Sequence, residues 1–259
     1  MRRIHSLALT VLLACGMAVP WATAQDEPES DTLQPALEDT MSVQVPAEIA
    51  PSEVSTAAAV KRANTWLRRL LYRGVLDVTH IGAYAEYQLT SWSESTGSYG
   101  PVDARLTVSY LGSTRWLGAD AEWLQAVYRA VDEEAVVIEY DVIVPSSSTV
   151  DDVHRVVYRV DRGEIKAADF SISASEVDYD RSDRPVSEGA EALKQYTGTY
   201  LTEKLRGSGT DGAEVVIYRT ADLPPLGIVR LGYGEEGLTF VAGGDDAVPR
   251  MNVPPPPSR

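Results

Sequence analysis

The sequence predicts a mainly β protein of the α+β class, in which a curved antiparallel sheet or half-barrel of about 8–10 strands follows one N-terminal amphipathic helix. Three patterns support this prediction. Apolar residues recur at helical spacing over residues 60–71, and from residue 83 onward they alternate with polar residues, which is the period of a strand. Turn residues separate the alternating segments at roughly 8–12 residue intervals, as is typical of antiparallel sheets.

The composition excludes several classes of protein. Of the 259 residues, 44% are hydrophobic and 24% are charged, a balance that excludes a wholly disordered chain and a polytopic membrane protein. The single cysteine, Cys15, excludes a disulfide framework and a thiolate metal site. The net charge of −15 indicates a chain that repels nucleic acid, so we expect no nucleic-acid partner.

Residues 1–24 have the pattern of a secretory signal peptide. Arg2 and Arg3 form a basic start, an apolar stretch follows, and Ala22 and Ala24 fit the small-residue rule for cleavage. The mature chain is then expected to begin at Gln25 and to be periplasmic or secreted.

A second processing route stays open at the same end of the chain. The segment Leu12-Leu13-Ala14-Cys15 resembles the bacterial lipobox, in which the cysteine is lipidated. Lipidation of Cys15 would anchor the protein in the outer membrane, and we expect membrane association only in that case. The alternative is a cysteine that serves as a small apolar residue of the signal peptide.

The mature chain divides into three parts. Residues 25–57 are rich in acids, contain no Lys or Arg and are interrupted by prolines, which predicts a disordered acidic tether. Residues 58–243 carry the helical and strand patterns and are expected to form a single β-rich domain. Residues 244–259 include a run of prolines at 254–257 and are expected to form a disordered Pro-rich tail.

The predicted helix combines an apolar stripe with a basic surface. Trp66 lies beside the stripe, which consists of Val60, Ala63, Leu67, Leu70 and Leu71. The bases are Lys61, Arg62, Arg68, Arg69 and Arg73. One interpretation is a cover for the sheet, with the bases near acids of the domain. The other is a helix that faces a membrane or a partner, where each base near an anionic surface contributes about 1 kcal/mol.

The first hairpin has a register that the sequence specifies. If the apolar sets of residues 83–89 and 104–110 share a face, Leu89 pairs with Ala104 and Tyr87 pairs with Leu106. A slip of one residue would turn one apolar set outward, so this register is favoured.

The second hairpin joins residues 136–144 to residues 156–160. Pairing Tyr140 with Val156 puts the apolar sets on one face and places Asp141 opposite Arg155 on the other. Cross-strand pairs of opposite charge contribute roughly 0.2–1 kcal/mol each. Both the apolar pattern and the charges favour this register.

Further strands are expected at residues 165–173, 196–205, 214–219, 227–232 and 237–242. Residues 121–131 fit both a strand and a helix, because apolar residues recur there at either period. The neighbouring strands favour a strand.

Aromatic and branched residues gather on one face of the predicted sheet, where they could line a groove for a ligand. This candidate lining consists of Tyr87, Leu106, Val108, Tyr110, Ile138, Tyr140 and Tyr158, with Trp66 of the helix. Tyrosine hydroxyls are tolerated in such a lining. The alternative is a plain hydrophobic core whose hydroxyls reach its rim.

The sequence carries no catalytic or cofactor signature. After cleavage the two remaining histidines, His80 and His154, are too few for a zinc site, and no phosphate-cradling loop or dinucleotide fingerprint occurs. We therefore expect a protein that is not an enzyme and holds no cofactor. The acids Asp178, Asp180 and Asp183 are candidates for calcium binding or carboxylate-based hydrolysis, with a solvated acidic loop as the alternative.

One resemblance to a known family can be stated. The segment Leu223-Pro224-Pro225-Leu226-Gly227-Ile228-Val229-Arg230-Leu231 is similar to a proline, turn and strand piece of the periplasmic lipoprotein-carrier (Lol-type) half-barrels and their uncharacterised relatives. The layout of export signal, helix and antiparallel strands resembles theirs too. The resemblance implies a concave sheet whose apolar face, partly covered by the helix, holds acyl chains.

The predicted function is that of an exported bacterial envelope protein, not an enzyme, which binds an apolar, lipid-like ligand or an envelope protein on its curved sheet. Two alternatives stay open. One is a secreted hydrolase that uses carboxylates, and the other is a lipid-anchored structural or assembly protein.

Overall fold

The computed structural model describes residues 53–93, 98–131, 136–146, 153–168, 170, 185–209 and 212–252. All of them belong to a compact unit formed by Glu48–Arg259. The predicted signal peptide, Cys15, most of the acidic tether, the prolines at 254–257 and the candidate acids Asp178, Asp180 and Asp183 lie outside the described residues.

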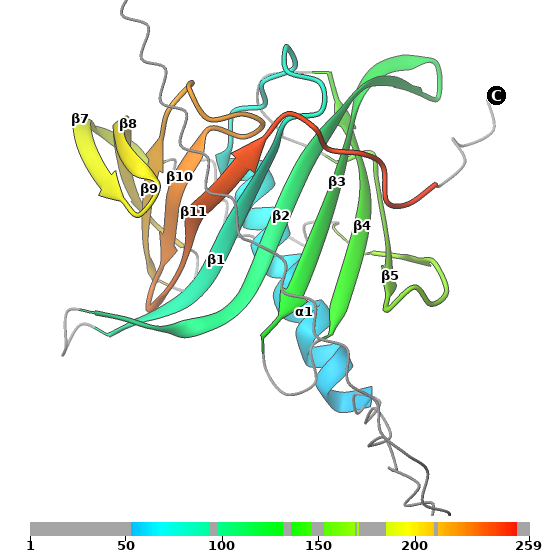
Figure 1. The fold of residues 1–259 in the computed structure, drawn as a ribbon, viewed down its shortest axis with the longest axis horizontal. Helices are drawn as coiled ribbons and strands as arrows, with labels where there is room; N and C mark the ends of the chain where they lie inside the picture. The colour runs from blue at the N-terminus through cyan, green and yellow to red at the C-terminus, as the bar shows by residue number, and fades with distance from the viewer. Residues whose placement is uncertain are drawn as a thin grey trace, which may run out of the picture. The chain divides into compact units, whose positions relative to one another are not determined.

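The described residues form one helix and one antiparallel sheet (Figure 1). The helix α1 spans Glu53–Arg73. The strands of the first run are β1 (Tyr84–Ser93), β2 (Ser98–Trp116), β3 (Ala119–Ala130), β4 (Val137–Pro145), β5 (Arg155–Val160) and β6 (Lys166–Ala167). Those of the second run are β7 (Val186–Gln195), β8 (Gly198–Ser208), β9 (Glu214–Arg219), β10 (Ile228–Tyr233) and β11 (Glu236–Gly244).

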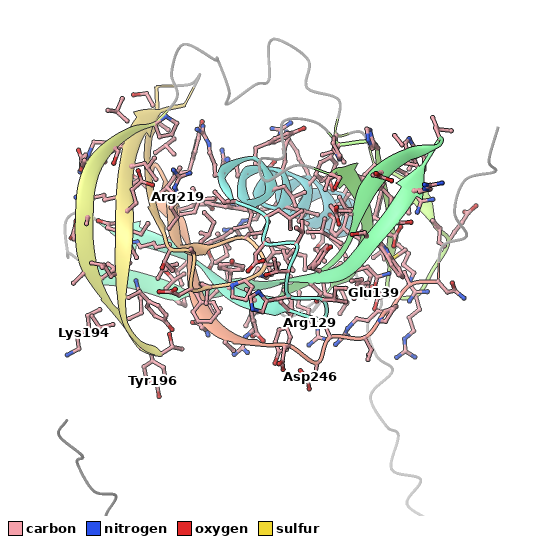
Figure 2. All side chains as sticks on the ribbon, turned by 90° about the horizontal axis from the view of Figure 1, so that it is seen from above. Arg129, Glu139, Lys194, Tyr196, Arg219 and Asp246 are labelled. Atoms are coloured by element: carbon pink, nitrogen blue, oxygen red, sulfur yellow. The ribbon has the colours of Figure 1, made fainter. Side chains whose placement is uncertain are left out.

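The sheet is a pair of meanders that meet in its middle. Its strand order is β6-β5-β4-β3-β2-β1-β11-β10-β9-β8-β7, so β1 and β11 join the two runs. The sheet is open, with β6 and β7 at its two ends, and it bends around α1 (Figure 2). We call the face toward α1 the inner face and the opposite face the outer face. The curved antiparallel sheet with one N-terminal helix is confirmed, with eleven strands in the described residues.

The core lies between α1 and the inner face of the sheet. The helix contributes its apolar stripe, and the side chains of Ala63, Trp66, Leu67, Leu70 and Leu71 are at most 1% exposed. Alternate residues of β1 and β2, including Tyr87, Leu89 and Leu106, are buried against them. A helix with one apolar stripe and strands with one apolar face can bury both only by packing together, which explains this arrangement.

Charged side chains fix the helix across the middle of the sheet. Arg62 donates from Nη2 to Asp103 of β2 (3.0 Å) and to Glu236 of β11 (2.7 Å). Trp66 donates from Nε1 to the other oxygen of Glu236 (3.2 Å). These bonds join α1 to β2 and β11, which are the two strands that pair with β1 in the middle of the sheet.

The register of the first hairpin is confirmed, and that of the second is corrected. In β1 and β2, Leu89 pairs with Ala104 and Tyr87 with Leu106. In β4 and β5, Tyr140 pairs with Tyr158 rather than with Val156, a shift of two residues. A shift of two leaves every side chain on its expected face, so the alternation that identified the strands could not detect it.

The predicted ion pair survives this shift as a diagonal contact. Arg155 Nη2 lies 2.5 Å from Asp141 Oδ2, although Arg155 pairs in register with Ile143. Diagonal neighbours on one face of a sheet are within reach of a long side chain such as arginine.

Strands β3 and β7 bear on two further points of the predicted sheet. The ambiguous segment 121–131 is confirmed as a strand, because β3 runs through it. Strand β7 was not predicted. Its sequence VSEGAEALKQ has no apolar alternation, and nearly all of its residues are exposed, because it forms the end of the sheet.

Candidate ligand-binding site

An open pocket of about 720 Å³ lies between the segment that follows α1 and the strands β7 and β8 at one end of the sheet. Its walls come from residues 75–77, which follow α1, from β7 and β8, and from residues 219–227 at the end of β9 and in the loop to β10. Segments that are far apart in the sequence therefore form a single concave surface. Its volume falls within the range of about 300–1,000 Å³ found for small-molecule sites.

Glycine backbone geometry shapes one wall of this pocket. Gly227 has a φ of +68°, and a Cβ there would lie 2.7 Å from the carbonyl oxygen of Thr220. The amide of Gly227 donates to Leu223, and its carbonyl accepts from the amide of Thr220 (2.8 Å). A glycine is therefore required to close the loop that carries the wall.

Apolar side chains dominate both the base and the mouth of the pocket. Leu76 and Leu223 are buried at 3% and 8% exposure, whereas Leu201 is 71% exposed and Val75 is 39% exposed. Exposed large apolar side chains beside a concave apolar surface are typical of a binding site for an apolar molecule.

The charged groups of the lining are Asp77, which is bonded to Thr79 and His80, and the ion pair of Arg219 with Glu203. Arg219 donates from Nε and Nη2 to Oε2 of Glu203, with its Nη2 at 2.8 Å. Figure 2 shows Arg219 between the β7–β8 hairpin and α1. Hydrogen bonds from Arg219 and from Ser187 hold the pKa of Glu203 below its ordinary value, so this carboxylate is charged near neutral pH. The charges of this pair cancel, which favours an uncharged ligand next to it, while the carboxylate of Asp77 at the same pocket disfavours an anionic one.

The residues predicted to line a ligand groove lie elsewhere. Most of them are fully buried under α1 as part of the core, and none lines the pocket. The structure does bring them together on the inner face, as the alternation predicts. A ligand-lining role for Tyr87, Leu106, Val108, Tyr110, Ile138, Tyr140, Tyr158 and Trp66 stays a prediction, and it would require α1 to move away from the sheet.

The hydroxyls of two of these tyrosines differ in their hydrogen bonding. Tyr140 donates its hydroxyl proton to Asn64 of α1 (2.8 Å), whereas the fully buried hydroxyl of Tyr87 has no hydrogen-bond partner within the described residues. Burial raises the pKa of the Tyr87 hydroxyl, so it stays protonated. A buried hydroxyl without a partner loses its bonds to water and gains none in return.

The substitution Tyr87→Phe is therefore expected to raise the free energy of unfolding by about 1 kcal/mol, because it removes the unpaired hydroxyl and keeps the ring. The matched substitution Tyr140→Phe is expected to lower it by about 1 kcal/mol, because it removes a formed hydrogen bond. Urea unfolding followed by circular dichroism measures both. Equal losses in the two variants would contradict this difference.

The basic helix is largely engaged within the protein. Arg62 pairs with acids of the sheet, the Arg69 guanidinium lies 3.4 Å from the centroid of the Tyr233 ring, and Arg73 is 9% exposed. The other two bases, which are exposed or half-buried, are Lys61 and Arg68. A helix that faces a membrane or a partner stays a prediction, and it would depend on these two residues.

The pocket residues themselves were missed by sequence reasoning. Ala190, Leu201 and Thr220 carry no motif, and they meet only because β7 curls beside the loop that follows β9. The segment Pro224-Pro225-Leu226-Gly227 has the composition of a turn and is the one local signal that could have located this wall.

The described residues contain no group of three or more His, Cys, Asp or Glu side chains arranged to hold a metal ion. No helix among them is both long enough and apolar enough to cross a membrane.

Comparisons with known proteins do not assign a family. No family model matches the chain, and no curated protein matches it. A solved structure, the crystal structure of MucB, is similar over 73% of this chain and 60% of its own length, with 13% identity and a TM-score of 0.26. This is a weak similarity at the level of the fold.

Proposed function

We propose that this protein is an exported bacterial envelope protein that binds an uncharged, lipid-like ligand in the pocket beside α1 and performs no catalysis. Export rests on the signal-peptide pattern of residues 1–24. Anchoring through Cys15 would hold the same pocket near a membrane, whereas cleavage before Gln25 would release it.

The observation that carries the proposal is the apolar mouth of the pocket. Leu201 keeps 71% of its surface exposed beside a concave wall, instead of packing against a neighbour. Burying exposed apolar surface is favourable by about 25 cal/mol per Å², so a ligand that covers this side chain gains free energy directly. The open mouth also means that such a ligand can enter without unfolding the sheet.

The polar groups of the pocket restrict the kind of ligand. An anionic headgroup would have to compete with Glu203 for Arg219 and would meet the carboxylate of Asp77. A cationic headgroup would have to compete with Arg219 for Glu203, or with Thr79 and His80 for Asp77. An uncharged ligand leaves this pair intact. Hydroxyl, ester or amide groups could then bond to the rim while an aliphatic chain fills the base.

The substitution Leu201→Asp is expected to weaken binding of an uncharged apolar probe at least about tenfold, because it places a carboxylate at the apolar mouth. The probe is N-phenyl-1-naphthylamine, whose fluorescence rises in apolar surroundings. Titration of wild type and variant with this probe gives both dissociation constants.

The matched control is Val186→Asp. Val186 is also 71% exposed and lies in β7, but it does not line the pocket. This variant is expected to bind the probe as wild type does. Failure of the wild-type protein to bind the probe, or equal weakening in both variants, would count against the pocket as the binding site.

A further inference from the structure

The chain beyond β11 does not leave the sheet but crosses its outer face. We call residues 245–252 the C-terminal strap. Figure 1 shows this segment, in red, crossing the strands of the first meander, and Figure 2 shows Asp246 on the side of the sheet opposite α1. The amide of Ala247 donates to the carbonyl of Gly82 (2.9 Å) and fixes the start of the strap. A Cβ at Gly82 would lie 2.6 Å from the carbonyl oxygen of Asp245, so the close approach requires glycine there.

At the far end of the strap, side chains of the sheet bond to its backbone groups. Gln125 of β3 accepts at Oε1 from the amides of Arg250 (2.7 Å) and Met251 (3.3 Å), and it donates from Nε2 to the carbonyl of Met251 (2.7 Å). Arg159 of β5 donates to the carbonyl of Arg250 (3.1 Å). Two side chains of the sheet thus satisfy four backbone groups of the strap.

Only one side chain of the strap is buried. Met251 is 1% exposed, although it lies near the end of the described chain, and its neighbours in the strap are exposed or half-buried. Val127 and Ile143, which share the outer face with Gln125, are also buried. The outer face therefore buries one unbranched side chain of the strap beside a polar site for backbone, and buried apolar residues lie on either side of Gln125.

Contacts within the sheet orient the polar site. Asp141 is 1% exposed and accepts from Gln125 Nε2 (3.1 Å), from Trp123 Nε1 (2.6 Å) and from Arg155. A carboxylate only accepts, so it holds the amide nitrogen of Gln125 toward itself and turns Oε1 toward the strap. A receptor held in its binding orientation loses little entropy when it binds.

We propose that Gln125, Arg159 and the apolar site for Met251 form a peptide-binding site on the outer face, which the strap closes in its own chain and which also accepts residues 245–252 of a second copy. Backbone bonds that supply affinity, with one side-chain site that supplies selectivity, are the features by which proteins bind extended peptides. The contacts are the same whichever copy supplies the strap, so exchange between copies costs no contact.

The test uses the full chain with its own strap weakened by Met251→Asp and a fluorescein-labelled peptide of residues 245–252. The peptide is expected to bind this variant, and to bind wild type at least about tenfold more weakly, because the attached strap competes at high effective concentration. Fluorescence anisotropy measures both affinities. Adding Gln125→Ala to the variant is expected to weaken binding at least about tenfold.

A second variant, Met251→Ser, removes only the apolar side chain and serves if the aspartate prevents folding. A peptide in which serine replaces the methionine is the matched control, and it is expected to bind either variant at least about tenfold more weakly. Circular dichroism establishes that each variant is folded. No binding of the unaltered peptide to a folded variant would overturn the proposal, and so would equal binding to wild type, because the peptide would then bind elsewhere.

Discussion

The substitution Trp66→Ala is expected to lower the free energy of unfolding by about 3–5 kcal/mol, the range for removal of a buried aromatic side chain. Trp66 is 1% exposed, lies between α1 and the sheet, and donates to Glu236. Its loss leaves a cavity beneath the helix and an acceptor on β11 without its donor. Guanidinium unfolding followed by circular dichroism gives the free energy.

The control for this prediction is Lys61→Ala. Lys61 is exposed on the same helix, and the change keeps a good helix former, so the expected effect is within about 0.5 kcal/mol. A loss below about 1 kcal/mol for Trp66→Ala would mean that α1 contributes little to the folded state. That result would favour a helix that is displaced easily from the inner face.

The substitution Asp141→Ala is expected to lower the free energy of unfolding by about 3–5 kcal/mol, the range for breaking a buried ion pair from one side. It removes the shared acceptor of Arg155, whose side chain is 16% exposed, of Trp123 and of Gln125. Because Gln125 also holds the strap, the variant is expected to lose protection of residues 245–252 against proteolysis.

The matched control is Asp120→Ala. Asp120 is 80% exposed and lies 3.7 Å from Arg115, so its ion pair is screened by water and contributes little. Chemical unfolding compares the two variants directly. Similar losses in both would show that burial does not set the strength of the Asp141 pair.

Much of the first meander could be predicted because its apolar residues alternate with the two-residue period of a strand. The β1–β2 register followed from the requirement that Leu89 and Ala104 share the buried face. The β4–β5 register was missed by two residues, because the pattern repeats every two residues and Asp141 reaches Arg155 in either alignment.

The candidate sites could not be predicted in the same way. The pocket depends on β7, whose residues are exposed on both faces and so follow no apolar alternation. The strap is held through backbone groups of Arg250 and Met251. Backbone groups of this kind are present throughout any sequence, so the sequence gives no sign of these bonds. Prediction from side-chain periodicity succeeds where one face is buried, and it has no signal where long-range backbone contacts decide the arrangement.

The segment between α1 and β1 contacts both the pocket and the strap. Its first residues form a wall of the pocket and are bonded to the β9–β10 loop, through Val75 to Leu226 and Asp77 to Pro225, while Gly82 at its other end binds the strap. A ligand that shifted residues 75–77 would act on a segment whose other end holds the strap, at most seven peptide units of roughly 3.3–3.6 Å each along the chain. Thermodynamic linkage then makes the effect mutual: by whatever factor a filled pocket changes strap docking, strap release changes ligand affinity by the same factor.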